Sequence, residues 1–81
     1  MTRIVTMGTK DDHTVRVIED TNRREVKVVE YDHLMQSNLL ATFGAGGGIG
    51  DAFDNCRAYT DARFPGYGLD YTARGAEFYA V

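Results

Sequence analysis

The glycine-rich stretch Gly44–Gly50, with the sequence GAGGGIG, is the part of this chain that most suggests chemistry. Backbone N–H groups of such a loop, placed before a helix, attract phosphate. A Walker A loop, however, requires Lys and then Ser or Thr after its last glycine, whereas this chain has Asp51 and Ala52 there. Because the Asp51 carboxylate would repel a phosphate, phosphate binding is one alternative of three. The others are a structural corner between two helices and a backbone surface that contacts a partner.

Metal-ligating and nucleophilic residues are sparse. His13 and His33 lie far apart, and neither belongs to a spacing that binds metal, so we expect no metal and no cofactor. Cys56 lies on the apolar stripe of a predicted helix, where an unpaired cysteine packs as a small apolar residue instead of acting as a nucleophile. No pair of carboxylates is arranged for acid–base catalysis. We therefore expect that the protein is not an enzyme.

Aromatic and arginine residues gather in the last third of the chain. This combination stacks on single-stranded bases, and it is also enriched at protein–protein interfaces. Acidic residues among the aromatics favour a protein partner over a nucleic-acid backbone, and packing in the core is the alternative role for Tyr71. The predicted contact residues are Arg57, Arg63, Tyr67, Tyr71 and Arg74, together with the backbone of Gly46, Gly47 and Gly48.

An antiparallel hairpin is the clearest element among those that would position these residues. Valine alternates with polar residues in two neighbouring stretches, which is the period-two pattern of half-buried strands. A tight turn at residues 21–22 would pair Val17 with Val26 on one face. The predicted strands of this half are Arg3–Met7, His13–Asp20 and Arg24–Tyr31.

Two helices and a second hairpin are predicted to follow. A short helix over residues 33–43 would have Asp32 as its N-cap. The stretch Asp51–Phe64 predicts a longer helix, because its apolar residues recur at helical spacing and Pro65 follows directly. The residues Tyr67–Val81 predict a hairpin that ends the chain.

These elements predict one small α+β domain covering all 81 residues. The expected order is ββ-β-α-α-ββ, a mostly antiparallel sheet of four to five strands with two helices packed on one face. An open edge at the first or last strand would also allow two copies of the chain to pair as a homodimer.

Charge and cysteine content limit the partners and the compartment. The net charge of −3 argues against non-specific nucleic-acid binding, which needs clustered Lys and Arg. The run His33–Gly50 has no formal charge, yet its polar residues and five glycines exclude a lipid-exposed membrane helix. A single cysteine fits a reducing compartment, so we expect a cytoplasmic protein with no membrane segment.

As a whole-chain pattern, the sequence resembles the small anti-CRISPR inhibitors carried by phages and mobile elements. The shared features are the first hairpin, the glycine corner, the helix Asp51–Phe64 and the terminal strand Glu77–Val81. The resemblance implies a non-enzymatic, stoichiometric inhibitor that binds a Cas protein or effector complex in the host cytoplasm. The group shares no motif, so no residue's role is carried over. The alternatives are a single-stranded nucleic-acid-binding domain that uses Tyr and Arg stacking, and a phosphate site at Gly44–Gly50.

Overall fold

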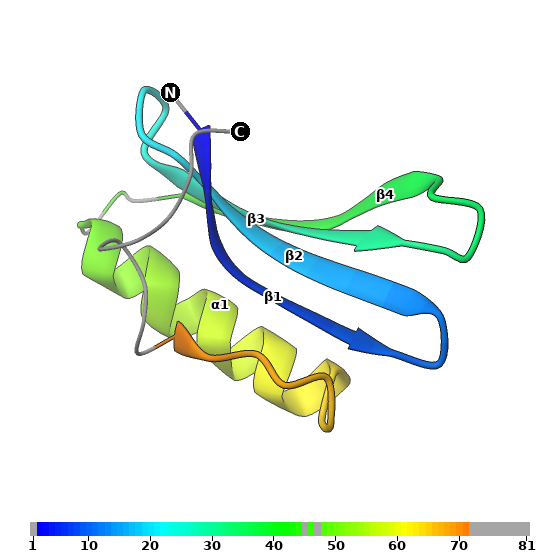
Figure 1. The fold of residues 1–81 in the computed structure, drawn as a ribbon. Helices are drawn as coiled ribbons and strands as arrows, with labels where there is room; N and C mark the ends of the chain where they lie inside the picture. The colour runs from blue at the N-terminus through cyan, green and yellow to red at the C-terminus, as the bar shows by residue number, and fades with distance from the viewer. Residues whose placement is uncertain (1, 45, 47, 72–81) are drawn as a thin grey trace.

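The computed structural model describes residues 2–44, 46 and 48–71, and within them the chain forms a four-stranded antiparallel sheet followed by an α-helix. The strands lie side by side in chain order, and the helix follows the last strand (Figure 1). This arrangement confirms the predicted α+β class in its coarse form. The elements are β1 (Thr2–Lys10), β2 (His13–Asp20), β3 (Glu25–Tyr31), β4 (Ser37–Gly44) and α1 (Ile49–Arg63).

The hairpin of β2 and β3 is confirmed, but its register differs from the predicted one by two residues. The connection is a four-residue loop, residues 21–24, instead of a two-residue turn, and Val17 pairs with Val28 rather than with Val26. The Asp20 carboxylate stabilises this loop, since its Oδ1 accepts two of the loop's backbone N–H groups at 3.1 and 3.2 Å. A shift of two keeps every side chain on its predicted face of the sheet.

The predicted helix over residues 33–43 is wrong, because this stretch forms a turn and then β4, which pairs with β3 along its whole length. Asp32 does accept N–H groups as an N-cap would, since its Oδ1 receives those of Leu34 (2.8 Å) and Gln36 (3.0 Å). Met35, however, has φ +61°, and this left-handed conformation reverses the chain instead of extending a helix. Pairing with β3 then outweighs the helical preference of the residues that follow.

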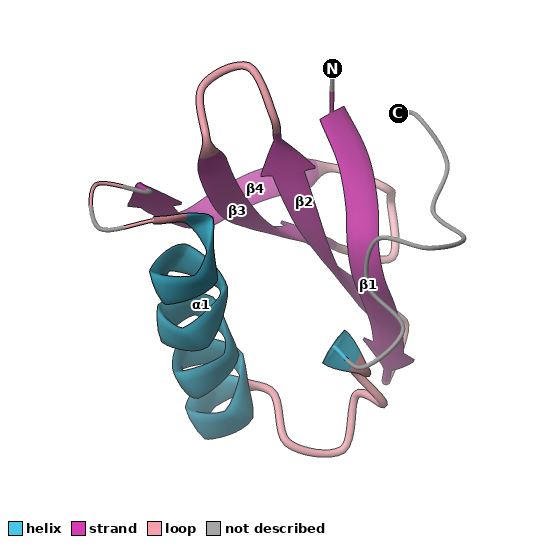
Figure 2. Ribbon diagram, turned by 90° about the vertical axis from the view of Figure 1, so that its left-hand side faces the viewer, coloured by secondary structure: helices cyan, strands magenta, loops and turns pink. Residues whose placement is uncertain are grey.

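The second predicted helix is confirmed by α1, which packs against β3 and β4 on one face of the sheet (Figure 2). Among the described residues it is the one α-helix, so the predicted pair of helices is corrected to one. It begins after Gly48, whose φ of +120° favours glycine. The glycine stretch therefore joins a strand to a helix, not two helices. The buried residues of α1 follow the predicted stripe and are Ala52, Phe53, Cys56 and Thr60.

The core lies between α1 and the sheet and is built mainly from valines of the first three strands. Because these valines sit at every second position, they all point to the helix side. Each contributes about 1.5–3 kcal/mol when fully buried. The buried apolar residues are Val5, Val15, Val17, Val26, Val28, Ala52, Phe53, Cys56 and Tyr71.

After α1 the chain passes against β1 on the helix side of the sheet. Gly8 lies so close to the Tyr67 backbone that a Cβ at this position would overlap the Tyr67 carbonyl oxygen. A little further on, the Asp70 N–H donates to Thr6 Oγ1 at 2.9 Å. This segment closes the core beneath β1, where α1 does not reach.

The predicted C-terminal hairpin is corrected in its first part. Tyr67 lies in a bend and residues 68–70 are irregular, so this part of the chain is not a strand. The rest of that prediction, residues 72–81 with the strand Glu77–Val81, lies outside the described residues. Within the described part of the chain, no helix has both the length and the apolar character needed to cross a membrane.

Candidate interaction surface

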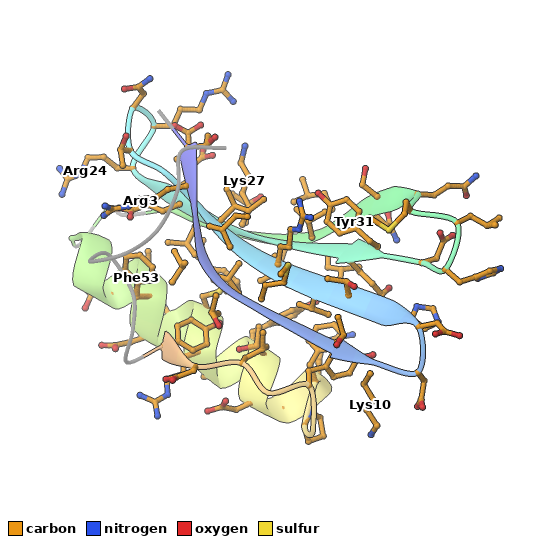
Figure 3. All side chains as sticks on the ribbon, viewed as in Figure 1. Arg3, Lys10, Arg24, Lys27, Tyr31 and Phe53 are labelled. Atoms are coloured by element: carbon orange, nitrogen blue, oxygen red, sulfur yellow. The ribbon has the colours of Figure 1, made fainter. Side chains whose placement is uncertain are left out.

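The sheet has one face covered by α1 and a second face that no described helix or strand covers (Figure 1, Figure 2). Side chains alternate along a strand, so Ile18 points away from α1 because its neighbour Val17 points toward it. We name the uncovered side the open face. Figure 3 shows Lys27 and Tyr31 of β3 projecting from this side, while Phe53 of α1 lies beneath the sheet.

The strand register arranges the open face in cross-strand rows, each with one residue from each strand. The two central rows are mainly apolar, with one cation in each. The two outer rows carry polar or small residues, apart from the ring of Tyr31. The central rows are Ile4, Ile18, Lys27, Thr42 and Met7, Arg16, Val29, Leu39; the outer rows are Thr2, Asp20, Glu25, Gly44 and Thr9, Thr14, Tyr31, Ser37.

Large apolar side chains are exposed on this face and at the turn beside it. Met7 on β1 is 50% exposed and Leu39 on β4 is 57% exposed. The turn between β3 and β4 adds Leu34 and Met35, each more than 60% exposed. Exposed apolar residues that cluster, rather than lie scattered singly, mark surfaces that contact other molecules.

Arg16 and Tyr31 form the most ordered polar feature of the open face. The Arg16 guanidinium carbon lies 4.7 Å from the centroid of the Tyr31 ring, a cation–π contact that restrains both side chains. The Nε of Arg16 is shielded from solvent and has no acceptor among the described residues. Arg16 as a whole is half-buried, so its guanidinium charge would stabilise a carboxylate of a partner that contacts this face.

Acidic side chains border the cations at one end of the open face. Lys27 Nζ lies 3.8 Å from Glu25 Oε2. The hydrogen bond from the Arg23 backbone lowers the pKa of Asp20, so this carboxylate is ionised at neutral pH. The open face therefore has an apolar, cationic centre and an acidic end.

The two predicted contact arginines of α1 are exposed, on the side of the sheet opposite the open face. Arg57 Nε lies 3.8 Å from Asp61 Oδ2, one helical turn further along. The Arg63 guanidinium carbon lies 5.0 Å from the centroid of the Tyr59 ring. Each arginine is thus held by a neighbour on its own helix, and neither is brought to the open face.

Tyr67, another predicted contact residue, is half-buried and belongs to a chain of aromatic contacts. Its ring meets that of Phe64 edge to face, with the centroids 5.2 Å apart. Phe64 contacts Tyr59 in the same way at 6.5 Å, and Tyr59 contacts Phe43 of β4 at 5.7 Å. This chain of rings seals one side of the core, so Tyr67 packs as well as presenting part of its ring to solvent.

Tyr71 was predicted to contact a partner, and its burial in the core corrects that prediction. Its hydroxyl lies 2.8 Å from Thr60 Oγ1 and 3.5 Å from Cys56 Sγ. Thr60 Oγ1 also donates to the backbone carbonyls of Cys56 and Arg57, at 3.1 and 3.2 Å. Burial raises the pKa of both Tyr71 and Cys56, which keeps them protonated at neutral pH. The prediction that Cys56 is buried in the core is confirmed.

The glycine stretch offers backbone to solvent at Gly46, which is exposed, while Gly48 is half-buried. A Cβ at either position would meet no atom within 4 Å. Asp51 is exposed in the first turn of α1, where its carboxylate already interacts with the helix N-terminus. Two further predicted contacts, Gly47 and Arg74, lie outside the described residues.

The histidines do not come together. His13 begins β2 as predicted, with its Nδ1 3.9 Å from Glu30 Oε2. His33 lies in the turn before β4, not in the first turn of a helix. In the part of the chain that the structure describes, no three side chains of the metal-binding types gather.

The open face was missed by sequence reasoning, although the sequence contains a signal for it. Ile18 and Val29 occupy positions that the alternation assigns to the solvent side, and an apolar residue there indicates a surface that is apolar on both faces. The contact of Arg16 with Tyr31 depends on the β2–β3 register, which pairs Tyr31 with Thr14. The predicted two-residue turn gives a β2–β3 register that is shifted by two residues, so it does not bring Tyr31 opposite Thr14.

Comparisons with known proteins identify no relative. No family model matches the chain, no curated protein matches it in sequence, and no solved structure matches its fold. A function has to be inferred from the side chains of the two faces themselves.

Proposed function

We propose that this chain is a non-enzymatic protein-binding module whose open face contacts a protein partner. The observation that carries the proposal is the pair of central rows, which are mainly apolar and contain Arg16 and Lys27, on the side of the sheet away from α1. Met and Arg, which the central rows contain, and Tyr, which Tyr31 supplies in the adjoining row, are enriched in protein interfaces.

The partner's surface is expected to be apolar with at least one carboxylate. Such a carboxylate would interact with the guanidinium of Arg16, which is half-buried on the open face. Single-stranded nucleic acid is the weaker alternative, because Arg16 already lies over the Tyr31 ring that a base would stack on. The acidic end of the face, with Asp20 and Glu25, would also repel a phosphate backbone.

The narrower form of the proposal follows from the resemblance to anti-CRISPR proteins. In that form the partner is a Cas protein or effector complex in the cytoplasm of a host, and the chain inhibits it by stoichiometric binding. The small size of the chain and the exposed apolar residues of its open face support a role of this kind.

The proposal is tested with matched charge variants that sit on opposite sides of the molecule. Met7→Glu places a carboxylate in a central row of the open face, whereas Ala62→Glu places one on the exposed side of α1. Purified Cas effector complexes and a host lysate are each incubated with immobilised wild-type protein and with both variants. We expect Met7→Glu to weaken capture about tenfold or more, as for an apolar side chain that an interface buries, and Ala62→Glu to leave it unchanged.

Three further measurements distinguish the open face from the other candidate binding sites. Loss of capture with Arg63→Glu, but not with Met7→Glu, would place the contact on α1 and contradict the open-face assignment. Binding to a labelled single-stranded oligonucleotide that falls steeply with salt would favour the nucleic-acid alternative. A thermal shift with a panel of nucleotides would favour a phosphate site at the glycine stretch.

A further inference from the structure

The outer edge of β4 lacks charged side chains and proline, two of the usual protections of a sheet edge. An edge strand presents unpaired N–H and C=O groups, and natural proteins blunt such edges with charged side chains or proline. β1, at the opposite edge, carries Arg3 and Lys10. The eight residues of β4, Ser37–Gly44, contain neither a charge nor a proline. No described strand pairs with their outer side.

Because of a bulge in β4, the side chains of the strand point to the two faces of the sheet in an order that is the same when read from either end. Val28 pairs with Ala41 and Val29 pairs with Leu39, so Leu40 is the extra residue. Leu40 packs against the core, and Ala41, opposite the buried Val28, also lies on the helix side. The sequence of faces, with o for the open face and h for the helix side, is therefore o-h-o-h-h-o-h-o from Ser37 to Gly44.

We propose that β4 pairs antiparallel with β4 of a second copy of this chain, about a two-fold axis between Leu40 and Ala41. Opposed residues in an antiparallel pair must point to the same face. The palindromic order of faces satisfies this condition over the whole strand. The opposed pairs are Ser37 with Gly44, Asn38 with Phe43, Leu39 with Thr42, and Leu40 with Ala41. The two sheets then form one continuous sheet with α1 of both copies on the same side.

A second copy is the occupant that the charge pattern favours. Around a two-fold axis any charge in β4 would enter the interface twice, once from each copy, and would be desolvated there with no opposite charge in β4 to pair with. The absence of charge from β4 removes that cost, whereas a foreign strand could carry the opposite charge and compensate it.

The ends of the strand fit the same arrangement. Antiparallel pairing places the turn of one copy, with the exposed Leu34 and Met35, beside Gly44 of the other copy. The chain carries no charge from there through Gly50, and Gly46 is exposed. The exposed apolar turn of each copy thus lies next to an uncharged segment of its partner.

The test uses a double variant that puts cations in the pairing without changing the core. Leu39→Lys with Thr42→Lys places two like-charged pairs across the interface, because Leu39 of one copy faces Thr42 of the other. Both side chains are exposed in the single chain, so the fold is expected to be kept. The neutral control is Leu39→Gln with Thr42→Gln, and the location control is Thr9→Lys at the exposed end of β1.

Sedimentation equilibrium over a range of concentrations measures the dimer dissociation constant, and hydrogen exchange reports the β4 amides. We expect the full-length chain to dimerise, with exchange of β4 amides that slows as concentration rises. The lysine pair should raise the dissociation constant about tenfold or more, and both controls should stay near the wild-type value. A chain that stays monomeric, or a dimer weakened equally by Thr9→Lys or untouched by the lysine pair, would overturn the proposal. Because Leu39 and Thr42 also belong to the central rows of the open face, Met7→Glu on the opposite edge strand is measured in the same way, and a dimer weakened equally by it would place the contact on the open face and overturn this proposal.

Discussion

At the scale of single residues, glycine is required at Gly8 for reasons of space. A Cβ there would overlap the carbonyl oxygen of Tyr67, and backbone cannot move aside as the end of a flexible side chain can. We expect Gly8→Ala to destabilise the fold by about 1–3 kcal/mol, the usual range for overpacking. Chemical denaturation with circular dichroism measures this loss.

The matched control is Gly46→Ala, at an exposed position where an added Cβ meets no atom within 4 Å. Alanine at this position lowers the conformational entropy of the unfolded chain. We therefore expect a small gain in the free energy of unfolding. Equal stability of the two alanine variants would contradict the close packing of the chain after α1 against β1.

At the scale of elements, Asp32 organises the turn between β3 and β4. Its carboxylate accepts the N–H groups of Leu34 and Gln36, and the bond to Gln36 is the main cause of the lowered pKa of Asp32. Asp32→Ala removes the acceptor, so amide exchange at Leu34 and Gln36 should accelerate at least severalfold. Asp32→Asn keeps an oxygen acceptor and should preserve most of the protection.

The pH dependence of the same turn provides the check. Because the folded-state pKa of Asp32 lies below its ordinary value of 3.8, the stabilisation is complete above that value and is lost as the pH falls through the folded-state pKa. Exchange at the two amides should lose its Asp32-dependent protection in acid, after correction for the intrinsic exchange rate. Protection that is unchanged in Asp32→Ala would show that the turn is held by β3–β4 pairing alone.

The elements also show how far this sequence predicts its own fold. β2, β3 and α1 could be predicted because each has a single clear periodicity. The stretch now in β4 could not, since its spaced leucines also fit a helix and the choice depends on pairing with β3.

In the candidate site, too, some features could be predicted from the sequence and others depend on the folded chain. The exposure of Arg57 and Arg63 could be read from the helical pattern, whereas the burial of Tyr71 depends on Thr60 and Cys56, which only the folded chain brings to it. The open face depends on which side of the sheet α1 covers, and that is decided by the packing of the whole chain.

At the scale of the whole molecule, the two proposals place different surfaces in contact with different partners. The open face of one copy and that of its β4-paired partner would lie side by side on one continuous sheet. A dimer built in this way presents two copies of the central rows to one side. Its affinity for a partner with two sites would then exceed that of a single face without any new contact.

The stability of the whole molecule should fall in alkaline solution, because Cys56 and Tyr71 are buried in their protonated forms. The unfolded chain releases these protons near the ordinary values of 9.0 for the thiol and 10.0 for the phenol, whereas burial raises both pKa values in the folded chain. The folded state therefore binds more protons above pH 9. Its free energy of unfolding should fall by at most about 1.4 kcal/mol per pH unit for each group.

Denaturant unfolding between pH 7 and 11 measures this slope in the wild type, in Tyr71→Phe and in Tyr71→Phe with Cys56→Ser. Tyr71→Phe should cost about 1 kcal/mol at pH 7, the net value of one hydrogen bond, and should make the alkaline slope shallower. The double variant removes both titrating groups and should remove their share of the slope entirely. Parallel alkaline slopes in all three proteins would mean that the Cys56–Tyr71–Thr60 cluster does not keep its protons, and that the loss arises from repulsion among surface charges instead.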